Sequence, residues 1–348
     1  MEWLARFVLL LAAFISSAIL TWQLRRYALR QGMLDVPNAR SSHQQPIPRG
    51  GGLALVVVVE VGITLLHLQQ QLPLSHWLAV SGGVAVALIG WIDDRSHVAA
   101  RWRLLVQFLA TGWLLWWLIE SLPMGGIGGL LLLAIGVVWC SNLYNFMDGI
   151  DGIAAVQLMS VCVGSALLPL LATAVSADGL DVDAMVNATF SSYQIVALLL
   201  AAASGGFLLF NWPPARIFMG DVGSSYSGFI VAALPLLAAG ALPLPAWLIL
   251  NSLFFVDATV TLLVRIGRGE RWYEAHRSHA YQRAAERLGA HRPVTMAVLL
   301  INLFWCWPLA WATLYWPEMA LLLMGVTGVP LVGAMLIVSL PLSDTATR

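Results

Sequence analysis

The chain alternates between long apolar stretches and short polar connections. Eleven stretches come close to the length that crosses a bilayer, at roughly 4–24, 51–68, 76–92, 104–119, 127–141, 153–175, 192–212, 226–240, 242–264, 294–315 and 318–340. Membrane-barrel strands are shorter and alternate in polarity, whereas these stretches are continuously apolar. The pattern therefore predicts about eleven transmembrane helices.

Composition indicates the same class of protein. Hydrophobic residues make up 59% of the 348 residues and charged residues only 10%, whereas soluble proteins average about 25% charged residues. In a bilayer such a chain must satisfy its backbone hydrogen bonds internally. We therefore expect an all-α polytopic membrane protein in which residues 1–348 form a single integral-membrane domain.

Charge and cysteine content exclude other classes. The formal net charge is zero, so nothing indicates a nucleic-acid partner. The three cysteines, Cys140, Cys162 and Cys306, lie in or beside apolar stretches. They therefore suggest neither a disulfide framework nor a zinc site.

Arginine predicts the orientation of the chain. All 18 basic residues are arginine, and when the connections are numbered alternately, 17 fall on one set and only Arg6 on the other. Positively charged connections stay in the cytoplasm, which places the N-terminus outside and the C-terminus inside. Every polar motif described below falls on the arginine-rich side. We therefore expect an active site on the cytoplasmic face.

The most informative motif occupies residues 137–155. Amides and carboxylates recur there every three residues, at Asn142, Asn145, Asp148 and Asp151. In a helix the first three would share an arc of about 120°. Oxygen ligands suit a hard cation such as Mg²⁺, and the intervening glycines let a backbone approach a phosphate. The alternative is an ordinary polar loop between two spans.

Two further acidic motifs adjoin apolar stretches. Asp93 and Asp94 follow one stretch directly, which suits a metal site or a general base. The alternative is a solvated loop end paired with Arg95, Arg101 or Arg103. Asp221 lies between Gly220 and Gly223. A small turn there lets a carboxylate and backbone amides meet a metal–phosphate unit. The alternative is an acidic residue that caps a helix.

Two basic motifs complete the set. Arg49 precedes the glycine triplet 50–52, where backbone N–H groups at a helix start and a guanidinium attract phosphate. The connection 265–293 is expected to be an exposed loop with a diphosphate clamp, made of Arg271, His276, Arg277, His279 and Arg283. Ser278 is expected to cap a short helix over about 279–288. The alternatives are an ordinary loop for the first motif and an amphipathic helix on anionic lipid for the second.

Together these motifs resemble the polyprenyl-phosphate N-acetylhexosamine-1-phosphate transferase family (glycosyltransferase family 4) over residues 35–287. The motifs that support this resemblance most strongly are Asp93-Asp94, residues 142–152 and residues 218–224. The resemblance implies ten or eleven membrane helices, dependence on Mg²⁺ with Mn²⁺ as the alternative ion, and often a homodimer. It also implies that a UDP-N-acetylamino sugar and undecaprenyl phosphate react to give a lipid diphospho-sugar and UMP.

The same resemblance implies roles for individual residues. Asn145 and Asp221 look like the metal ligands, and Asp93, Asp94 and Asp148 look like catalytic carboxylates. The resemblance also implies a set of substrate-binding residues, which includes the uridine pocket and the sugar-diphosphate site: Ser42, His43, Arg49, Asn142, Asp151, Asn211, Phe218, Arg271, His276, Arg277 and His279. Of these, Asp151, Asn211 and Phe218 resemble the uridine pocket.

The basic loop separates branches of that family. The peptidoglycan branch has adjacent histidines, whereas here His276 and His279 are separated by two residues. This spacing looks more like enzymes that initiate lipopolysaccharide O-chains in the bacterial inner membrane. Their donors are UDP-N-acetylfucosamine, UDP-N-acetylquinovosamine or UDP-N-acetylglucosamine, and the sequence leaves that choice open.

Two other functions are compatible with a membrane protein that has acidic loops. An intramembrane prenyltransferase also uses Mg²⁺, but its motifs space acids by three or four residues, whereas His97 is the third residue after Asp94. A transporter or lipid flippase places ionisable residues near the bilayer midplane. Here the polar motifs concentrate at one membrane surface, which favours catalysis.

The arginine distribution generates a testable topology. A reporter fused after Arg348 should be active only as a cytoplasmic fusion, because 17 of the 18 arginines lie on the side of that residue. A phosphatase fusion, which needs the oxidising exterior, serves as the reciprocal control. Exterior activity after Arg348 would contradict the orientation.

Overall fold

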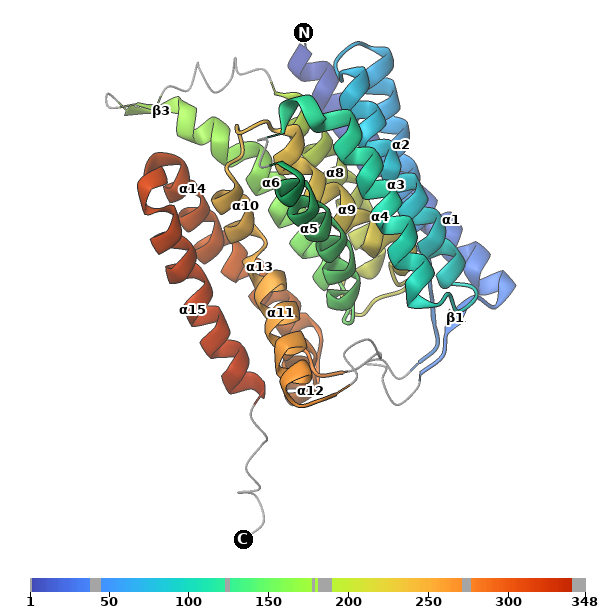
Figure 1. Ribbon diagram of the computed structural model, residues 1–348. Coiled ribbons are helices and arrows are strands. Elements are labelled where there is room, and N and C mark those ends of the chain that lie inside the picture. The colour runs from blue at the N-terminus through green and yellow to red at the C-terminus, as the bar shows by residue number, and fades with distance from the viewer. Residues whose placement is uncertain are drawn as a thin grey trace.

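The computed structural model describes residues 2–37, 45–122, 126–176, 179–180, 190–270 and 277–339. The helices within these ranges form one bundle (Figure 1): α1 (Glu2–Gln31), α2 (Gly52–Leu68), α3 (Leu74–Asp93), α4 (Ala100–Leu118), α5 (Gly126–Met147), α6 (Ile153–Ala174), α8 (Ser192–Asn211), α9 (Asp221–Leu237), α10 (Leu244–Leu250), α11 (Ser252–Gly267), α12 (Ala280–Leu288), α13 (Arg292–Ile301), α14 (Trp307–Tyr315) and α15 (Ala320–Ser339). Short antiparallel strand pairs join β1 (Leu34–Asp35) to β2 (Ile47–Pro48) and β3 (Val175–Ser176) to β4 (Gly179–Leu180). The all-α prediction is confirmed.

The helices confirm a polytopic membrane protein. Within the described ranges, eight spans are long and apolar enough to cross a membrane, and the bent pair α10 and α11 makes a ninth if it is one span. Helices α2 and α9 are apolar but shorter. All eleven predicted stretches are therefore helical, whereas the count of eleven crossings stays a prediction. Helix α1 begins at one end of the bundle and α15 ends at the other (Figure 1), as an odd number of crossings requires.

Two helix boundaries differ from the prediction near the polar motifs. Helix α5 continues past residue 141 to Met147, so Asn142 and Asn145 lie in its last turns and not in a loop. Helix α9 begins at Asp221 and not at residue 226. Hydropathy predicts α5 to end too early and α9 to begin too late. The reason is that the polar side chains at these two termini form hydrogen bonds with other helices and not with water.

The ninth predicted span is not straight. Helices α10 and α11 differ in direction by 76°. At the break, Asn251 donates from Nδ2 to the Trp247 carbonyl and accepts a hydrogen bond from the Tyr144 hydroxyl. Gln157 donates to the Leu250 carbonyl. A membrane helix can break where side chains satisfy its backbone groups. The predicted span 242–264 is therefore two helices, and a single crossing there stays a prediction.

Helix α9 occupies the centre of the bundle. It packs most extensively against α3 and α5 (Figure 1), and all residues from Asp221 to Leu234 are buried. A Cβ at Gly90 of α3 would lie 2.5 Å from the Asp221 carbonyl oxygen, and a Cβ at Gly228 would lie 2.5 Å from the Cys140 carbonyl oxygen of α5. These close approaches fix the start of α9 relative to the ends of α3 and α5.

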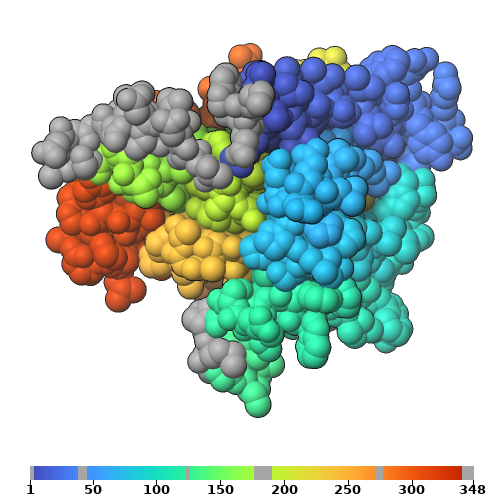
Figure 2. Space-filling model, turned by 90° about the horizontal axis from the view of Figure 1, so that it is seen from above, coloured from blue at the N-terminus to red at the C-terminus, as the bar shows by residue number. Residues whose placement is uncertain are grey.

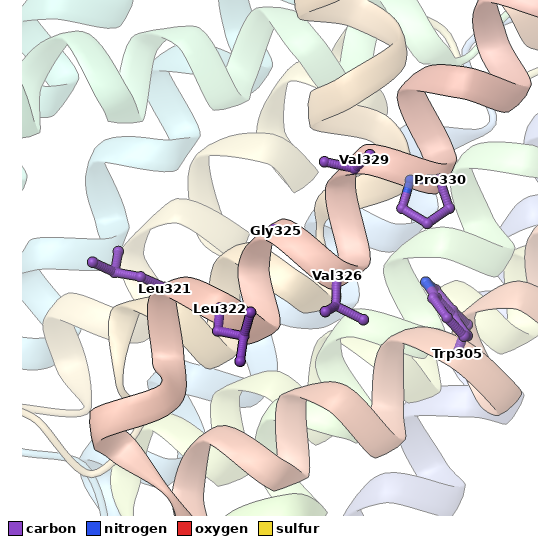
Figure 3. Close-up of a pocket in the computed structure, with 7 residues that line it drawn as sticks. All are labelled: Trp305, Leu321, Leu322, Gly325, Val326, Val329 and Pro330. Atoms are coloured by element: carbon purple, nitrogen blue, oxygen red, sulfur yellow. The ribbon is translucent and has the colours of Figure 1, made fainter.

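The periphery of the bundle is apolar. Seen from the end at which α1 begins, α14 and α15 form one edge and α3 and α4 lie on the other side of the molecule (Figure 2). An apolar groove of about 520 Å³ follows α15 (Figure 3), lined by Trp305, Leu321, Leu322, Gly325, Val326, Val329 and Pro330. Leu321 is 83% exposed, as expected of a side chain that faces lipid. The groove contains none of the polar motifs.

The contact between α5 and α9 generates a stability prediction. Gly228→Ala should lower the thermal unfolding midpoint by about 5 °C, because its Cβ must displace a backbone carbonyl and overpacking costs about 1–3 kcal/mol. Gly136→Ala on α5 is the matched control, since a Cβ there meets no atom within 4 Å. Equal midpoints for the two variants would contradict this account of the packing.

Candidate active site

Four carboxylates gather where α3 and α5 end and α9 begins. Asp93 ends α3, Asp94 follows it, Asp148 follows α5, and Asp221 opens α9; we call these four residues the acid centre. This level lies toward the end of the bundle that carries β1 and α12 (Figure 1). The fold therefore brings together three motifs that are far apart in the sequence.

The Asp94 side chain is only 1% exposed, against 11% for Asp93 and 12% for Asp221. Its Oδ1 accepts the N–H of Asp221 at 2.9 Å and its Oδ2 accepts the N–H of Val222 at 3.1 Å. These amides belong to the first turn of α9, where helix N–H groups lack intrahelical partners. Asp94 thus caps α9 from another helix. Burial raises the pKa of Asp94 to about 6, although Arg49 opposes that shift.

Two arginines connect the acid centre. Arg49 places Nε 2.8 Å from Asp94 Oδ1 and Nη2 2.6 Å from Asp221 Oδ1. Arg103 places Nη1 2.6 Å from Asp93 Oδ2 and 3.1 Å from Asp221 Oδ2. The two arginine side chains are 37% and 32% exposed. Guanidinium groups held at this surface can form paired hydrogen bonds with an incoming phosphate.

The position of Arg49 depends on two chain segments that run side by side. The Phe218 N–H donates to the Pro48 carbonyl at 2.8 Å, and the Gly51 N–H donates to the Phe218 carbonyl at 2.9 Å. The Gly52 N–H donates to the Met219 carbonyl. The amides of Gly51 and Gly52 are therefore not available to a phosphate, and that part of the prediction was wrong. Arg49 itself lies at the acid centre.

Asp148 differs from the other three carboxylates. No hydrogen-bond donor reaches its side chain among the described residues. The residue keeps a partly exposed surface, yet burial by the surrounding protein, followed by the charge of Asp221, raises its pKa well above the ordinary value. Nearby, Asn145 donates from Nδ2 to Ser224 Oγ at 3.1 Å. Its amide oxygen is thereby oriented as an acceptor.

The donor set bears on the predicted metal. Within the described ranges, no three His, Cys, Asp or Glu side chains are grouped closely enough to hold a metal ion unaided. Mg²⁺, however, commonly binds through one or two protein carboxylates together with water and substrate phosphates. Asp148 and Asp221 repel each other when both are ionised, and a divalent cation relieves such repulsion. The residues therefore fit a Mg²⁺ ion that takes most of its ligands from substrate and water.

Asn142 contacts a neighbouring helix. Its Nδ2 donates to Gln107 Oε1 of α4 at 2.7 Å and to the Val138 carbonyl at 2.8 Å. These bonds fix the last turns of α5 against α4. Both amide hydrogens are in use, so the assignment of Asn142 to substrate binding stays a prediction that depends on its amide oxygen.

Asp151 and Asn211 also bond to the protein's own backbone. Asp151 Oδ2 accepts the Ala215 N–H at 2.9 Å. Asn211 accepts the Gly152 N–H at 3.0 Å and donates to the Ile217 carbonyl at 2.9 Å. Both side chains are buried. They tie the turn after α5 to the segment before α9, and their predicted contact with uridine remains untested.

The basic loop is only partly described. Arg271 and His276 lie outside the described residues, as do Ser42 and His43 of the first cytoplasmic motif. Arg277 is half-buried, and its Nε is buried without a hydrogen-bond partner among the described residues. A buried donor of this kind suits an anionic ligand.

His279 is not on an exposed loop. It is the N-cap residue of α12, and its side chain is 5% exposed and lies 3.3 Å from the Asp257 carboxylate. The prediction that Ser278 caps this helix was wrong by one residue. Tyr281 and Ala285 of α12 are buried against the protein. Burial of one face of α12 disfavours the alternative in which it only contacts lipid, and replacing His279 must affect packing as well as chemistry.

Sequence analysis missed several residues of this region. Arg103 was considered only as one of three arginines that could pair with Asp93 and Asp94 at a solvated loop end, and the start of α4 places it opposite Asp93. His291 lies 3.1 Å from Asp151, a contact that no spacing rule indicates. Asp257 could have been found, because a carboxylate within an apolar stretch is costly unless it has partners.

Acidic residues joined by partly exposed arginines, at one end of a helical membrane bundle, fit one class of protein: an integral-membrane enzyme that acts on phosphate-bearing substrates at the membrane surface. Comparisons with known proteins agree with this class. The family model described as "Glycosyl transferase family 4" matches residues 76–239, which include the whole acid centre.

Curated relatives extend the similarity over most of the chain. Decaprenyl-phosphate N-acetylglucosaminephosphotransferase of Mycolicibacterium smegmatis is 30% identical over 331 residues, which cover 84% of this chain and 78% of that protein. The probable undecaprenyl-phosphate N-acetylglucosaminyl 1-phosphate transferase of Bacillus subtilis is 26% identical and covers 85% and 83%. Phospho-N-acetylmuramoyl-pentapeptide-transferase of Trichormus variabilis is 29% identical and covers 69% and 65%. The chain therefore belongs to glycosyl transferase family 4, whose members here are polyprenyl-phosphate sugar-1-phosphate transferases.

Proposed function

We propose that the protein transfers an N-acetylamino-sugar 1-phosphate from a UDP-sugar to undecaprenyl phosphate. An oxygen of the lipid phosphate attacks the sugar-bearing phosphorus of the donor. The bond from that phosphorus to the bridging oxygen breaks, and UMP leaves with that oxygen. The observation that carries the proposal is the acid centre. There Asp148, whose side chain has no hydrogen-bond donor among the described residues, lies beside an arginine-linked set of three carboxylates. Family membership supplies the class of reaction.

The proposed chemistry is mainly positioning and charge neutralisation. Asp221 and Asn145 would hold Mg²⁺, which reduces the repulsion between two anionic substrates. Arg49 and Arg103 both reach the Asp221 carboxylate from a partly exposed surface, so they are placed to contact a phosphate. Asp93 is assigned as the base that keeps the lipid phosphate ionised, because it is more exposed than Asp94 (11% against 1%).

The biological assignment extends the same proposal. We place the reaction on the cytoplasmic side of a bacterial inner membrane, at the initiation of lipopolysaccharide O-antigen or a related envelope glycan. The spacing of His276 and His279 supports this branch. The mycobacterial and Bacillus relatives are named for N-acetylglucosamine, which makes UDP-N-acetylglucosamine the first donor to test. A homodimer stays a prediction.

One assay tests the function. Membranes that contain the protein are incubated with undecaprenyl phosphate, Mg²⁺ and a panel of UDP-N-acetylamino sugars, and the lipid product and UMP are measured. We expect equal amounts of UMP and lipid diphospho-sugar with at least one donor, and none after chelation of divalent cations. Transfer from a prenyl diphosphate, or substrate flux into vesicles without UMP release, would instead support the prenyltransferase or transporter alternative.

The metal assignment predicts the behaviour of Asp221→Ala. This variant should lack activity at any practical Mg²⁺ or Mn²⁺ concentration, because it deletes a proposed ligand and also leaves Arg49 and Arg103 without a shared partner. Activity is measured across a Mg²⁺ titration, with thermal unfolding as a check on folding. Glu318→Ala removes an exposed carboxylate elsewhere and is the control. Full activity of Asp221→Ala would refute the assignment.

The role of Asp93 predicts a pH dependence. Asp93→Asn should slow transfer by on the order of a hundredfold or more and recover part of that loss at high pH. The reason is that a phosphate monoester loses its second proton with a pKa near about 6, and less base assistance is needed above that value. Rates of the variant and wild type are compared from pH 6 to about 9. Isolation of a sugar-phosphorylated enzyme before lipid is added would instead indicate a covalent intermediate on a carboxylate.

A further inference from the structure

Asp257 is a buried carboxylate that the proposed chemistry does not use. It lies in α11, is 2% exposed, and faces the first turn of α12. Its Oδ1 accepts the Ala280 N–H at 3.0 Å and its Oδ2 accepts the Tyr281 N–H at 3.0 Å. Thr261 donates to Oδ1 at 3.1 Å. A carboxylate this deeply buried is costly unless such donors surround it.

These contacts determine what the start of α12 can bind. The first amides of a helix form an anion site, because they lack intrahelical partners and lie at the positive end of the dipole. In α12 the protein's own carboxylate occupies the Ala280 and Tyr281 amides. The backbone at this helix start is therefore not open to a substrate diphosphate. Recognition of a diphosphate at this helix start therefore has to come from side chains.

A second contact places α12 against the acid centre. The Tyr281 hydroxyl donates to the Phe146 carbonyl at 2.9 Å, at the end of α5. A Cβ at Gly149 would overlap the Tyr281 hydroxyl and would lie 2.9 Å from Gln282 Nε2. The first turn of α12 therefore lies directly on the turn that carries Asp148. Asp257 holds α12 from one side, and Tyr281 joins it to the acid centre on the other.

We propose that Asp257 is a positioning residue for the transfer reaction. By fixing α12 between α11 and the end of α5, it sets where His279 and Arg277 stand relative to the acid centre. His279 adjoins the Asp257 carboxylate directly, and Arg277 has a buried Nε that lacks a protein partner among the described residues. The catalytic part of this inference rests on the proposed function, and the anchoring part does not.

The test separates positioning from a loss of folded enzyme. Asp257→Asn keeps the shape of the side chain but leaves only one acceptor oxygen. The Ala280 and Tyr281 amides each donate to a separate oxygen of Asp257, so one of them loses its acceptor. We expect kcat/KM for the UDP-sugar to fall by about 10- to 100-fold, with a raised KM for the UDP-sugar and an unchanged KM for undecaprenyl phosphate. A merely structural role would reduce the active fraction and leave both KM values unchanged, and that result would overturn the proposal.

Hydrogen exchange of the full-length protein supplies a readout that needs no activity. In Asp257→Asn the backbone amides at the start of α12 should exchange faster than in wild type, while those of α9 should not change. Glu286→Gln removes an exposed carboxylate from the same helix and should alter neither exchange nor KM. Unchanged exchange in Asp257→Asn refutes the anchoring even if the wild type transfers no sugar, so the two proposals fail separately.

A second variant guards against misfolding of the first. Tyr281→Phe keeps the aromatic ring but removes the hydrogen bond to the Phe146 carbonyl. It should raise the KM for the UDP-sugar in the same direction as Asp257→Asn but by a smaller factor, because the Asp257 contacts remain. A normal KM in Tyr281→Phe, together with a normal KM in Asp257→Asn, would show that the position of α12 does not affect donor binding.

Discussion

The contact between Asp94 and the first turn of α9 is the constraint on which the rest of the site depends. A carboxylate taken out of water at the end of an apolar bundle needs strong donors. The two amides that open α9 provide them, and their geometry fixes the end of α3 against the start of α9. Asp93, which precedes Asp94, and Asp221, which supplies one of the two amides, are thereby brought within reach of one guanidinium of Arg103. The relative positions of Asp93, Asp221 and Arg103 in the candidate site thus follow from a buried capping interaction.

A buried carboxylate caps the first turn of another helix at two places in the structure. Asp94 of the α3 terminus caps α9, and Asp257 of α11 caps α12, in each case across helices that are separated in sequence. Each carboxylate fills an anion site that would otherwise compete for substrate phosphate. We therefore expect substrate anions to be bound by side chains: by Arg49 and Arg103 at the acid centre and by Arg277 in the basic loop. In a low-dielectric surrounding such side-chain contacts are stronger than they are in water.

Part of the site could be predicted because its chemistry is local in sequence. Asp93, Asp148 and Asp221 lie beside glycines or at the ends of apolar stretches, where a carboxylate without a functional or structural task is unfavourable. The roles of individual residues could not be predicted in this way. Asp94 resembles a catalytic carboxylate, and Asn142 and Asn211 resemble substrate-binding residues, yet their described contacts are with the protein's own backbone and side chains. Spacing identifies a polar residue but not its partner.

The sequence by itself determined the class of fold, because continuous apolar stretches have one stable conformation in a bilayer, and it located the polar motifs at one membrane surface. Tertiary structure alone decided where helices end and break. Helix α5 extends through Asn145 because Gln107 and Ser224 replace water as hydrogen-bond partners, and α10 turns into α11 where Gln157 satisfies the Leu250 carbonyl. It also decided that His279 is buried, since Asp257 holds α12 against the bundle. Each of these outcomes depends on a partner far away in the chain, which local hydropathy does not contain.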